Sequence, residues 1–288
     1  MSLRFKLLIK NPQLETSDYS ILNSNYLTKT LSCDLYLPNT NHKPFILSCF
    51  ALSVDGKLCY PDLMSGFAIA KNNFLAAQDE RYADWWNLLL GRSISDAVII
   101  GSNTLSLENY NYTAEINIPE LTLLRKNLGK TESLLHIVIT RDSNKIDFEK
   151  ELLCQNNNLP LLIYTEQLPK IIPNNFHCAS IENIDLTKTK QLIHCSKINL
   201  TELSKYLYQN DIKTILNESP YYHHQLQELK LLDEAWINTS SVFIGGNVSQ
   251  LGQFNNAFDS NNHPHYTILT LHSLGYNFIY TRYKINYA

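Results

Sequence analysis

The chain has 288 residues, of which 44% are hydrophobic and 18% are charged, the composition of an ordinary globular protein with one large domain or two small ones. Its 24 Lys and Arg residues and 27 Asp and Glu residues give a net charge of −3. This balance argues against a dedicated binder of nucleic acids or anionic membranes, because such a protein would carry a basic face.

The first 43 residues are rich in Asn, Ser and Thr and lack a strong hydrophobic period. This pattern predicts an N-terminal arm or small appendage over residues 1–43, with at most a short strand at residues 31–37. Residues 44–288 then make up the main domain.

The main domain begins with residues 45–54 (FILSCFALSV), which are almost continuously apolar, as in a parallel strand buried on both faces. Strands and helices alternate after it, which predicts an α/β fold with a mostly parallel sheet and helices on both faces. The last two strands follow each other without a helix and predict an antiparallel C-terminal edge. Strands are expected at 96–101, 136–140, 159–165, 213–216, 234–244, 266–271 and 276–283, helices at 72–90, 199–210 and 221–232, and polar loops at 105–118, 142–158, 166–198 and 247–265.

Two of the helices have a candidate cap in the sequence. Asn72 or Asn73 can cap the helix at 72–90, and Asn199 can cap the helix at 199–210, with Glu202 at the third helical position. These residues predict where each helix begins.

The six cysteines form neither a C-x-x-C pair nor a zinc-like spacing with histidine. Reduced thiols in the cytoplasm are the simplest interpretation, and no metal site is predicted. No apolar run approaches the ~20 residues of a membrane span, and the N-terminus lacks the long apolar region of a signal peptide. We therefore expect a cytoplasmic protein without a membrane or nucleic-acid partner.

The segment Asn217-Glu218-Ser219-Pro220 joins a predicted strand to a predicted helix. Such a junction places a carboxylate and free backbone N–H groups at one edge of the sheet. Ligands bind at this edge in open α/β folds, and the positive end of a helix dipole suits a phosphate. The Glu218 turn is therefore a candidate ligand site.

Seven short motifs occur in order along these elements. They are residues 53–57 (SVDGK), 65–67 (SGF), 92–104 (RSISDAVIIGSNT), 137–142 (IVITRD), 218–220 (ESP) with 232–234 (LDE), 243–246 (FIGG) and 274–278 (LGYNF). Together they resemble the reductase (C-terminal) domain of the riboflavin-biosynthesis bifunctional deaminase–reductase, over residues 44–284. The resemblance implies a dihydrofolate-reductase-like three-layer fold, in which residues 44–288 form the reductase-like domain.

The resemblance implies a reaction as well as a fold. The family reduces the ribose of 5-amino-6-(5-phosphoribosylamino)uracil to a ribityl chain, with hydride passing from NADPH to the anomeric carbon. The implied partners are NADPH, a phosphorylated pyrimidine or pterin-like substrate, and a second copy of the chain in a homodimer. Because the cofactor carries the hard chemistry, no nucleophile–base pair is expected and no catalytic residue is assigned.

Three alternatives stay open at this point. The chain could reduce another pterin or pyrimidine, such as dihydrofolate. It could be a catalytically weakened homologue that binds a nucleotide. Finally, it could be an unrelated α/β protein whose motif matches are accidental.

The resemblance also assigns individual residues. Ser65, Arg92 and Glu218 match substrate-binding positions, and the planar guanidinium of Arg92 suits a bidentate contact with the substrate phosphate. Each assigned residue also has a plain structural interpretation, such as a core aromatic, a helix-end charge or a turn residue. Arg141 follows a strand and is either a solvated arginine or a contact to the 2′-phosphate of NADPH. The cofactor-binding positions are Leu52, Phe67, Thr104, Glu108, Ser219, Pro220, Gly245 and Gly246.

The chain departs from the family pattern in several places. Ser219-Pro220 replaces a glycine-rich turn, and Pro220 has no N–H group for a phosphate. Glu108 stands where the family has the first residue of an Asp-Asp-Pro sequence, and no second arginine follows until Arg125. Extra residues near 78–86 predict either a helix face or a roof over the pocket. The zinc motifs of the deaminase half do not occur, so residues 1–43 cannot deaminate.

Overall fold

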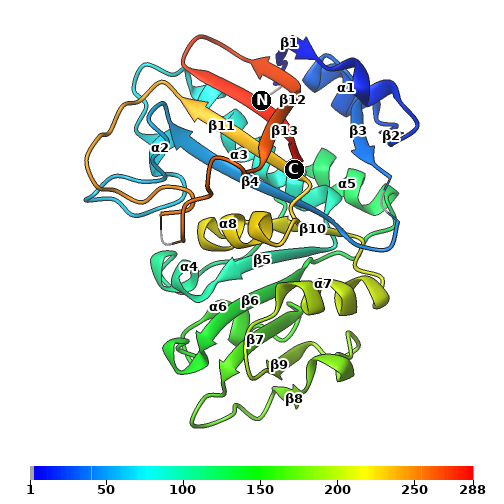
Figure 1. Cartoon of the computed structure of the whole chain (residues 1–288), viewed down its shortest axis with the longest axis vertical. Coiled ribbons are helices and arrows are strands. Elements are labelled where there is room, and N and C mark those ends of the chain that lie inside the picture. Colours follow the sequence, from blue (N-terminus) through cyan, green and yellow to red (C-terminus); the bar gives the residue numbers. More distant parts are fainter. Residues whose placement is uncertain (1–2, 40, 254, 288) are drawn as a thin grey trace.

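One mixed sheet of eleven strands runs through the computed structural model, which describes residues 3–39, 41–253 and 255–287 (Figure 1). A separate two-stranded sheet, β2–β3, lies beside it. The strands are β1 (Lys6–Lys10), β2 (Tyr19–Leu22), β3 (Leu35–Pro38), β4 (Phe45–Ser53), β5 (Ala97–Gly101), β6 (Leu135–Asp142), β7 (Leu161–Gln167), β8 (His177–Ala179), β9 (Lys190–His194), β10 (Thr214–Asn217), β11 (Glu234–Ser240), β12 (His265–Ser273) and β13 (Phe278–Asn286).

The predicted sheet is confirmed in both its parallel and its antiparallel parts. The strand order is β1-β12-β13-β11-β4-β10-β5-β6-β7-β9-β8, and all pairs from β11 to β8 are parallel. The pairs β11–β13, β12–β13 and β1–β12 are antiparallel. Strand β4 lies between two parallel neighbours and is buried along its first six residues, which explains its continuous apolar sequence.

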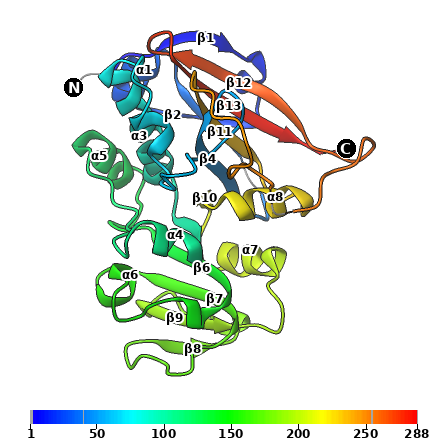
Figure 2. The ribbon, with the colours of Figure 1, turned by 90° about the vertical axis from the view of Figure 1, so that its left-hand side faces the viewer.

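Helices cover both faces of the sheet, as the three-layer prediction requires. One face carries α3, α5 and α6, and the other carries α7 and α8 (Figure 2). Among the described residues the α-helices are α1 (Asn25–Leu31), α2 (Ala68–Lys71), α3 (Gln78–Ile94), α4 (Ser102–Leu107), α5 (Pro119–Asn127), α6 (Leu152–Gln155), α7 (Leu200–Gln209) and α8 (Pro220–Glu228). None of these helices is long and apolar enough to cross a membrane.

The helix predicted at 72–90 is wrong at its start. Asn73 does not cap it; its side-chain oxygen accepts hydrogen bonds from the N–H groups of Leu75 and Ala76 and closes a turn instead. Phe74, inside the predicted helix, is 88% exposed in that turn. Helix α3 starts at Gln78, with its first turn held by the Glu80 carboxylate, which accepts from the N–H of Ala77.

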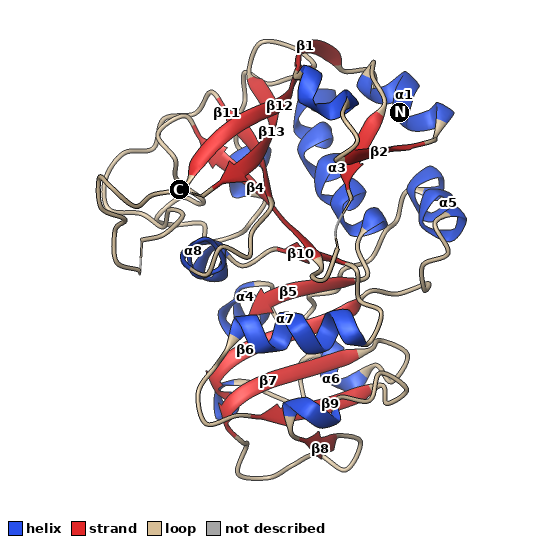
Figure 3. Ribbon diagram, turned by 45° about the vertical axis from the view of Figure 1, so that its right-hand side comes forward, coloured by secondary structure: helices blue, strands red, loops and turns tan. Residues whose placement is uncertain are grey.

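Two of the predicted loops contain regular structure. Residues 166–198 hold the short strands β8 and β9, which extend the parallel edge of the sheet (Figure 3). The predicted loop at 142–158 holds the short helix α6. Residues 119–127, for which no element was predicted, form α5, which begins with Pro119 at its first position, where a missing N–H group costs nothing. Their short or mixed sequences gave no clear period, so the pattern did not reveal them.

The segment before residue 43 joins the main sheet rather than extending away from it. Strand β1 pairs with β12, and the Phe5 ring packs against Trp86 and Tyr280 at centroid distances of 5.5 and 5.0 Å. The indole N–H of Trp86 donates to the hydroxyl of Tyr26 at 2.9 Å. Within the described residues, this segment therefore shares one core with the rest of the chain; the boundary at residue 43 stays a prediction.

Candidate active site

A cavity of about 860 Å³ lies at the carboxyl ends of the parallel strands β4, β5, β6 and β10. This is the edge at which open α/β sheets bind ligands, and the volume is typical of a small-molecule site. Helix α3 forms one wall, and the turn into α8 forms another. The site described below is built on these two elements.

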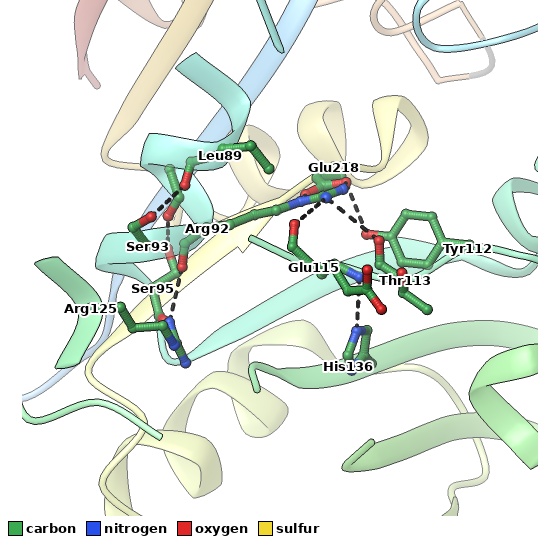
Figure 4. A network of polar contacts seen from close by, with 12 residues as sticks. Leu89, Arg92, Ser93, Ser95, Tyr112, Thr113, Glu115, Arg125, His136 and Glu218 are labelled. Carbon is green, nitrogen blue, oxygen red and sulfur yellow. Dashed lines mark hydrogen bonds and ion pairs between the residues drawn. The ribbon is translucent and has the colours of Figure 1, made fainter. Parts of the chain in front are cut away.

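A buried ion pair between Arg92 and Glu218 fixes one end of the cavity (Figure 4). The Arg92 Nε donates to Glu218 Oε1 at 2.7 Å, and its Nη2 donates to Oε2 at 2.8 Å, which is the bidentate geometry that aligns two planar groups. The side chains are 3% and 9% exposed. Two segments 126 residues apart in sequence thus meet at one point of the wall.

The turn after β10 aims Glu218 at this arginine. The Asn217 side chain accepts from the N–H of Ser219 at 3.1 Å and donates to Ser48 on the neighbouring strand at 2.9 Å. The N–H of Glu218 itself donates to the carbonyl of Ile99 on β5. Strands β4 and β5 therefore both hold the turn from which the Glu218 carboxylate projects.

The loop between α4 and α5 completes the surroundings of the pair. Tyr112 donates its hydroxyl to Glu218 Oε2 at 2.9 Å, and Arg92 Nη1 donates to the carbonyls of Thr113 and Glu115. The guanidinium also lies 5.4 Å from the Trp85 ring centre and 5.8 Å from that of Tyr112. Burial alone would lower the pKa of Arg92, but the charge of Glu218 raises it above its usual range, so the guanidinium stays charged.

Two buried side chains support that loop from behind. His136 Nε2 accepts from the N–H of Ala114 at 3.1 Å, and burial lowers the pKa of His136 to about 4, so the ring is neutral at pH 7. Arg125, the next arginine after Arg92, is 2% exposed and donates to the carbonyls of Arg92 and Ser95. Arg125 therefore stabilises the end of α3 and does not face the cavity.

The opposite end of the cavity carries three cations. Arg141 lies near the carboxyl end of β6, Lys145 just beyond that strand, and Lys197 follows β9. Asp142 and Glu166 line the same region. The two ends thus differ: one holds a charge pair that is satisfied internally, and the other presents several basic side chains to a ligand.

Most residues predicted for the site meet in this cavity. Ser65, Arg92 and Glu218 line it, and so do Phe67, Thr104, Glu108, Ser219 and Pro220.

Three predicted cofactor residues lie away from the described wall of the cavity. Leu52 lines a neighbouring cavity with His223 and Tyr266. Gly245 and Gly246 adopt positive φ angles of 73° and 63°, which glycine tolerates, in a turn whose Gly245 N–H donates to Asp55 at 2.7 Å.

Tyr112, Lys145, Lys197 and Asp84 are among the wall residues that sequence reasoning missed. Tyr112, Lys145 and Lys197 lie in segments read as loops, and nothing in their sequence marks them. Asp84 could have been found, because it precedes Arg92 by two helical turns and so shares its face of α3. Within the described residues, no group of three or more His, Cys, Asp and Glu side chains is placed to hold a metal ion.

Comparison with protein families identifies one family that matches most of the chain. The RibD C-terminal domain family matches residues 44–269. Sequence comparison with curated proteins finds no match.

Three of the similar solved structures show the same fold. A pyrimidine reductase-like protein from Corynebacterium diphtheriae is 18% identical, with 85% of this chain and 93% of that chain covered at a TM-score of 0.61. The riboflavin biosynthesis reductase of Saccharomyces cerevisiae is 13% identical, with 87% and 93% covered at 0.53. RibD from Acinetobacter baumannii is 15% identical at 0.59; 85% of this chain is covered but only 59% of that longer chain.

Proposed function

The chain belongs to the RibD C-terminal domain family, and from this membership we propose that it is an NADPH-dependent reductase of riboflavin biosynthesis. Its substrate would be 5-amino-6-(5-phosphoribosylamino)uracil, whose ribose it reduces to a ribityl chain. When bound, the reduced nicotinamide supplies the hydride, and the protein aligns donor and acceptor. The other pyrimidines and pterins named above are the alternative substrates.

The observation that carries the proposal is the Glu218 carboxylate, held by Arg92 at the wall of a ligand-sized cavity. A carboxylate fixed in this way accepts hydrogen bonds from the N–H groups of a pyrimidine or from sugar hydroxyls. The Arg92 donors are directed to Glu218 and to loop carbonyls. We therefore assign Arg92 the task of orienting Glu218, in place of the phosphate contact that the family resemblance implies.

The basic end of the cavity supports NADPH as the cofactor. A 2′-phosphate carries the charge that distinguishes NADPH from NADH, and Arg141 offers a planar fork for it beside Lys145 and Lys197. Arg141→Ala should weaken NADPH binding about tenfold, equivalent to ~1.4 kcal/mol, and leave NADH binding unchanged. Fluorescence titration with both cofactors measures this difference.

Arg81→Ala is the matched control, because Arg81 does not line this cavity and its guanidinium contacts the carbonyl of Lys71. It should bind both cofactors like the wild type. Equal losses for NADPH and NADH in Arg141→Ala would remove Arg141 from the 2′-phosphate site.

One observation favours a second candidate, a homologue that binds a nucleotide but turns over weakly. At the start of α8 the N–H of Ser219 is already bonded to Asn217, and Pro220 has none. The turn therefore offers fewer donors to a phosphate than a glycine-rich one. Rapid mixing of enzyme, NADPH and the uracil substrate separates the two: the reductase oxidises NADPH in the first turnover, whereas the binding protein changes fluorescence only.

The resemblance also supports a cytoplasmic homodimer that acts on a small molecule, without a nucleic-acid or membrane partner. Sedimentation of the purified chain tests the oligomeric part of this proposal. A single species at the 33.1 kDa of one chain would contradict it.

A further inference from the structure

Helix α3 presents a second carboxyl group to the cavity. Asp84, Leu88 and Arg92 follow one another at intervals of four residues and all line the cavity wall. At 1.5 Å per residue, Asp84 and Arg92 lie ~12 Å apart along the helix. The wall therefore holds two carboxyl groups at different places, Glu218 beside Arg92 and Asp84 two turns away.

The two carboxyl groups have opposite surroundings. Glu218 is paired with a guanidinium, whereas Asp84 is 5% exposed and receives one hydrogen bond, from the Asn238 amide at 2.7 Å. Asn87 donates in turn to the Asn238 oxygen at 3.3 Å, which fixes the amide with its NH₂ toward Asp84. Asp84 Oδ1 accepts that bond, and none of the described residues donates to Oδ2.

The groups around Asp84 do not neutralise its charge. Glu80 and Asp79 lie on the same helix, Cys49 on β4 and Tyr280 on β13, and none of them is a cation. Lys71 and Arg81 line a neighbouring hollow together with Asp84, but neither forms an ion pair with it. Burial raises the pKa of Asp84 to about 6, against the opposing effect of the Asn238 hydrogen bond. A bound ligand would displace more water from the cavity and favour the protonated form further.

We propose that Asp84 is the catalytic proton donor of the reduction, while Glu218, paired with Arg92, is the anchor of the substrate. The placement carries this assignment: Asp84 faces the cavity, keeps one oxygen free for a ligand and has no basic partner among the described residues. Pairs of carboxyl groups whose surroundings differ in this way divide into an acid and an anion in many active sites. The assignment rests on the proposed function, because it needs a hydride acceptor in the cavity.

The step balances as follows for the ring-opened form of the substrate. A new C–H bond forms at the carbon of the C=N bond, the π electron pair of that bond moves to nitrogen, and nitrogen takes the proton from Asp84. The substrate gains two electrons, which the nicotinamide loses as hydride. Asp84 is left as a carboxylate and takes up a proton from solvent before the next turnover.

Asp84→Asn tests the role with nearly unchanged shape. Wild-type kcat/KM should be constant below pH about 6 and fall tenfold per pH unit above it, because the acid must be protonated. The variant should lose ~10²-fold or more in kcat/KM and show no such dependence, whereas its Kd for NADPH should stay within about twofold of the wild type. Asp84→Glu should restore part of the activity and the pH dependence.

Infrared spectroscopy detects the protonation of the Asp84 carboxyl without turnover. In the infrared difference spectrum between the wild type and Asp84→Asn, the band of a buried protonated carboxyl should be present at pH 5 and disappear as pH rises through about 6. The buried carboxyl of Glu151, whose pKa burial raises to about 7, is common to both proteins and cancels in the difference. Asp79→Asn, on the first turn of the same helix, is the control and should keep both the band and the pH profile.

The outcomes separate the two proposals. A wild-type chain that oxidises NADPH, together with an Asp84→Asn variant that keeps the pH profile, would refute the role of Asp84 alone. A wild-type chain that does not oxidise NADPH with any pyrimidine substrate would refute both.

Discussion

Two buried arginine–glutamate pairs use the same chemistry in two regions of the molecule. In the cavity wall Arg92 holds Glu218, and in the antiparallel part of the sheet Arg282 Nη2 donates to the two oxygens of Glu234 at 2.9 and 2.8 Å. Both guanidinium groups also lie over a tryptophan ring. Their surroundings, rather than their chemistry, distinguish them.

The Arg282–Glu234 pair has all its hydrogen-bond partners within the protein. Glu234 is 1% exposed and also accepts from the Trp236 indole, while Arg282 donates to the carbonyl of Tyr36 in the N-terminal segment. This pair joins β11, β13 and β3. The Glu218 carboxylate, by contrast, borders a cavity. The comparison shows that a buried ion pair serves structure where its partners are all internal and function where one side faces a ligand.

Removing the charge of Glu234 should have the largest effect on stability. Glu234→Gln leaves Arg282 buried without a counter-charge, which typically costs about 3–5 kcal/mol. Urea unfolding measures the loss. A change below 1 kcal/mol would mean that the two regions do not differ as described.

Removing the charge of Glu218 should act mainly on activity. Glu218→Gln is expected to lower kcat/KM about 100-fold, equivalent to ~2.7 kcal/mol in the transition state, because the substrate loses its charged acceptor. The free energy of unfolding should fall less than in Glu234→Gln, since Arg92 keeps its contacts with the carbonyls of Thr113 and Glu115. Steady-state kinetics and urea unfolding are measured for both variants. A Glu218→Gln variant that is fully active and less stable than Glu234→Gln would contradict the comparison.

The smallest expected effect is on stability and concerns His136, which supports the loop behind the Arg92–Glu218 pair. The pKa of His136 is lowered to about 4 in the fold, so the unfolded chain binds a proton first as pH falls. The stability that His136 provides is complete above its unfolded pKa of about 6.5 and is lost between there and about 4. Because of His136, the free energy of unfolding should therefore fall by about 1 kcal/mol between pH 6.5 and pH 5.5.

His136→Gln isolates this contribution, because a glutamine oxygen can replace Nε2 as the acceptor for Ala114. The wild type should lose about 1 kcal/mol more than the variant across that pH range, measured by urea unfolding. Buried His223 and His272 have lowered pKa values of the same sign and remain in both proteins, so they cancel in the difference. Equal losses in the two proteins would show that His136 does not support the loop through its neutral ring.

The sequence predicted the elements whose signals are local. Asn199 caps α7 as expected, with its side-chain oxygen accepting from the N–H of Glu202, and β4 is the buried parallel strand that its apolar run indicated. The fold class and the family followed from such elements taken in order.

The sequence could not predict which charges meet. Arg92 looked like a free phosphate-binding arginine, and only the fold brings Glu218 to it across 126 residues. The same holds for Asp84, whose environment depends on Asn238 from a strand 154 residues away. Long-range pairing decides whether a charged side chain is available to a ligand, and no local pattern carries that information.

Deuterium transfer tests the central claim about the cavity most directly. The wild-type chain is incubated with 5-amino-6-(5-phosphoribosylamino)uracil and NADPH deuterated at the transferable position of the nicotinamide ring, and the product is examined by NMR. A ribityl product with one deuterium on the former anomeric carbon is expected, because hydride passes directly within the cavity. A product without that deuterium, or unchanged substrate beside bound NADPH, would contradict the claim that this cavity is a reductase site.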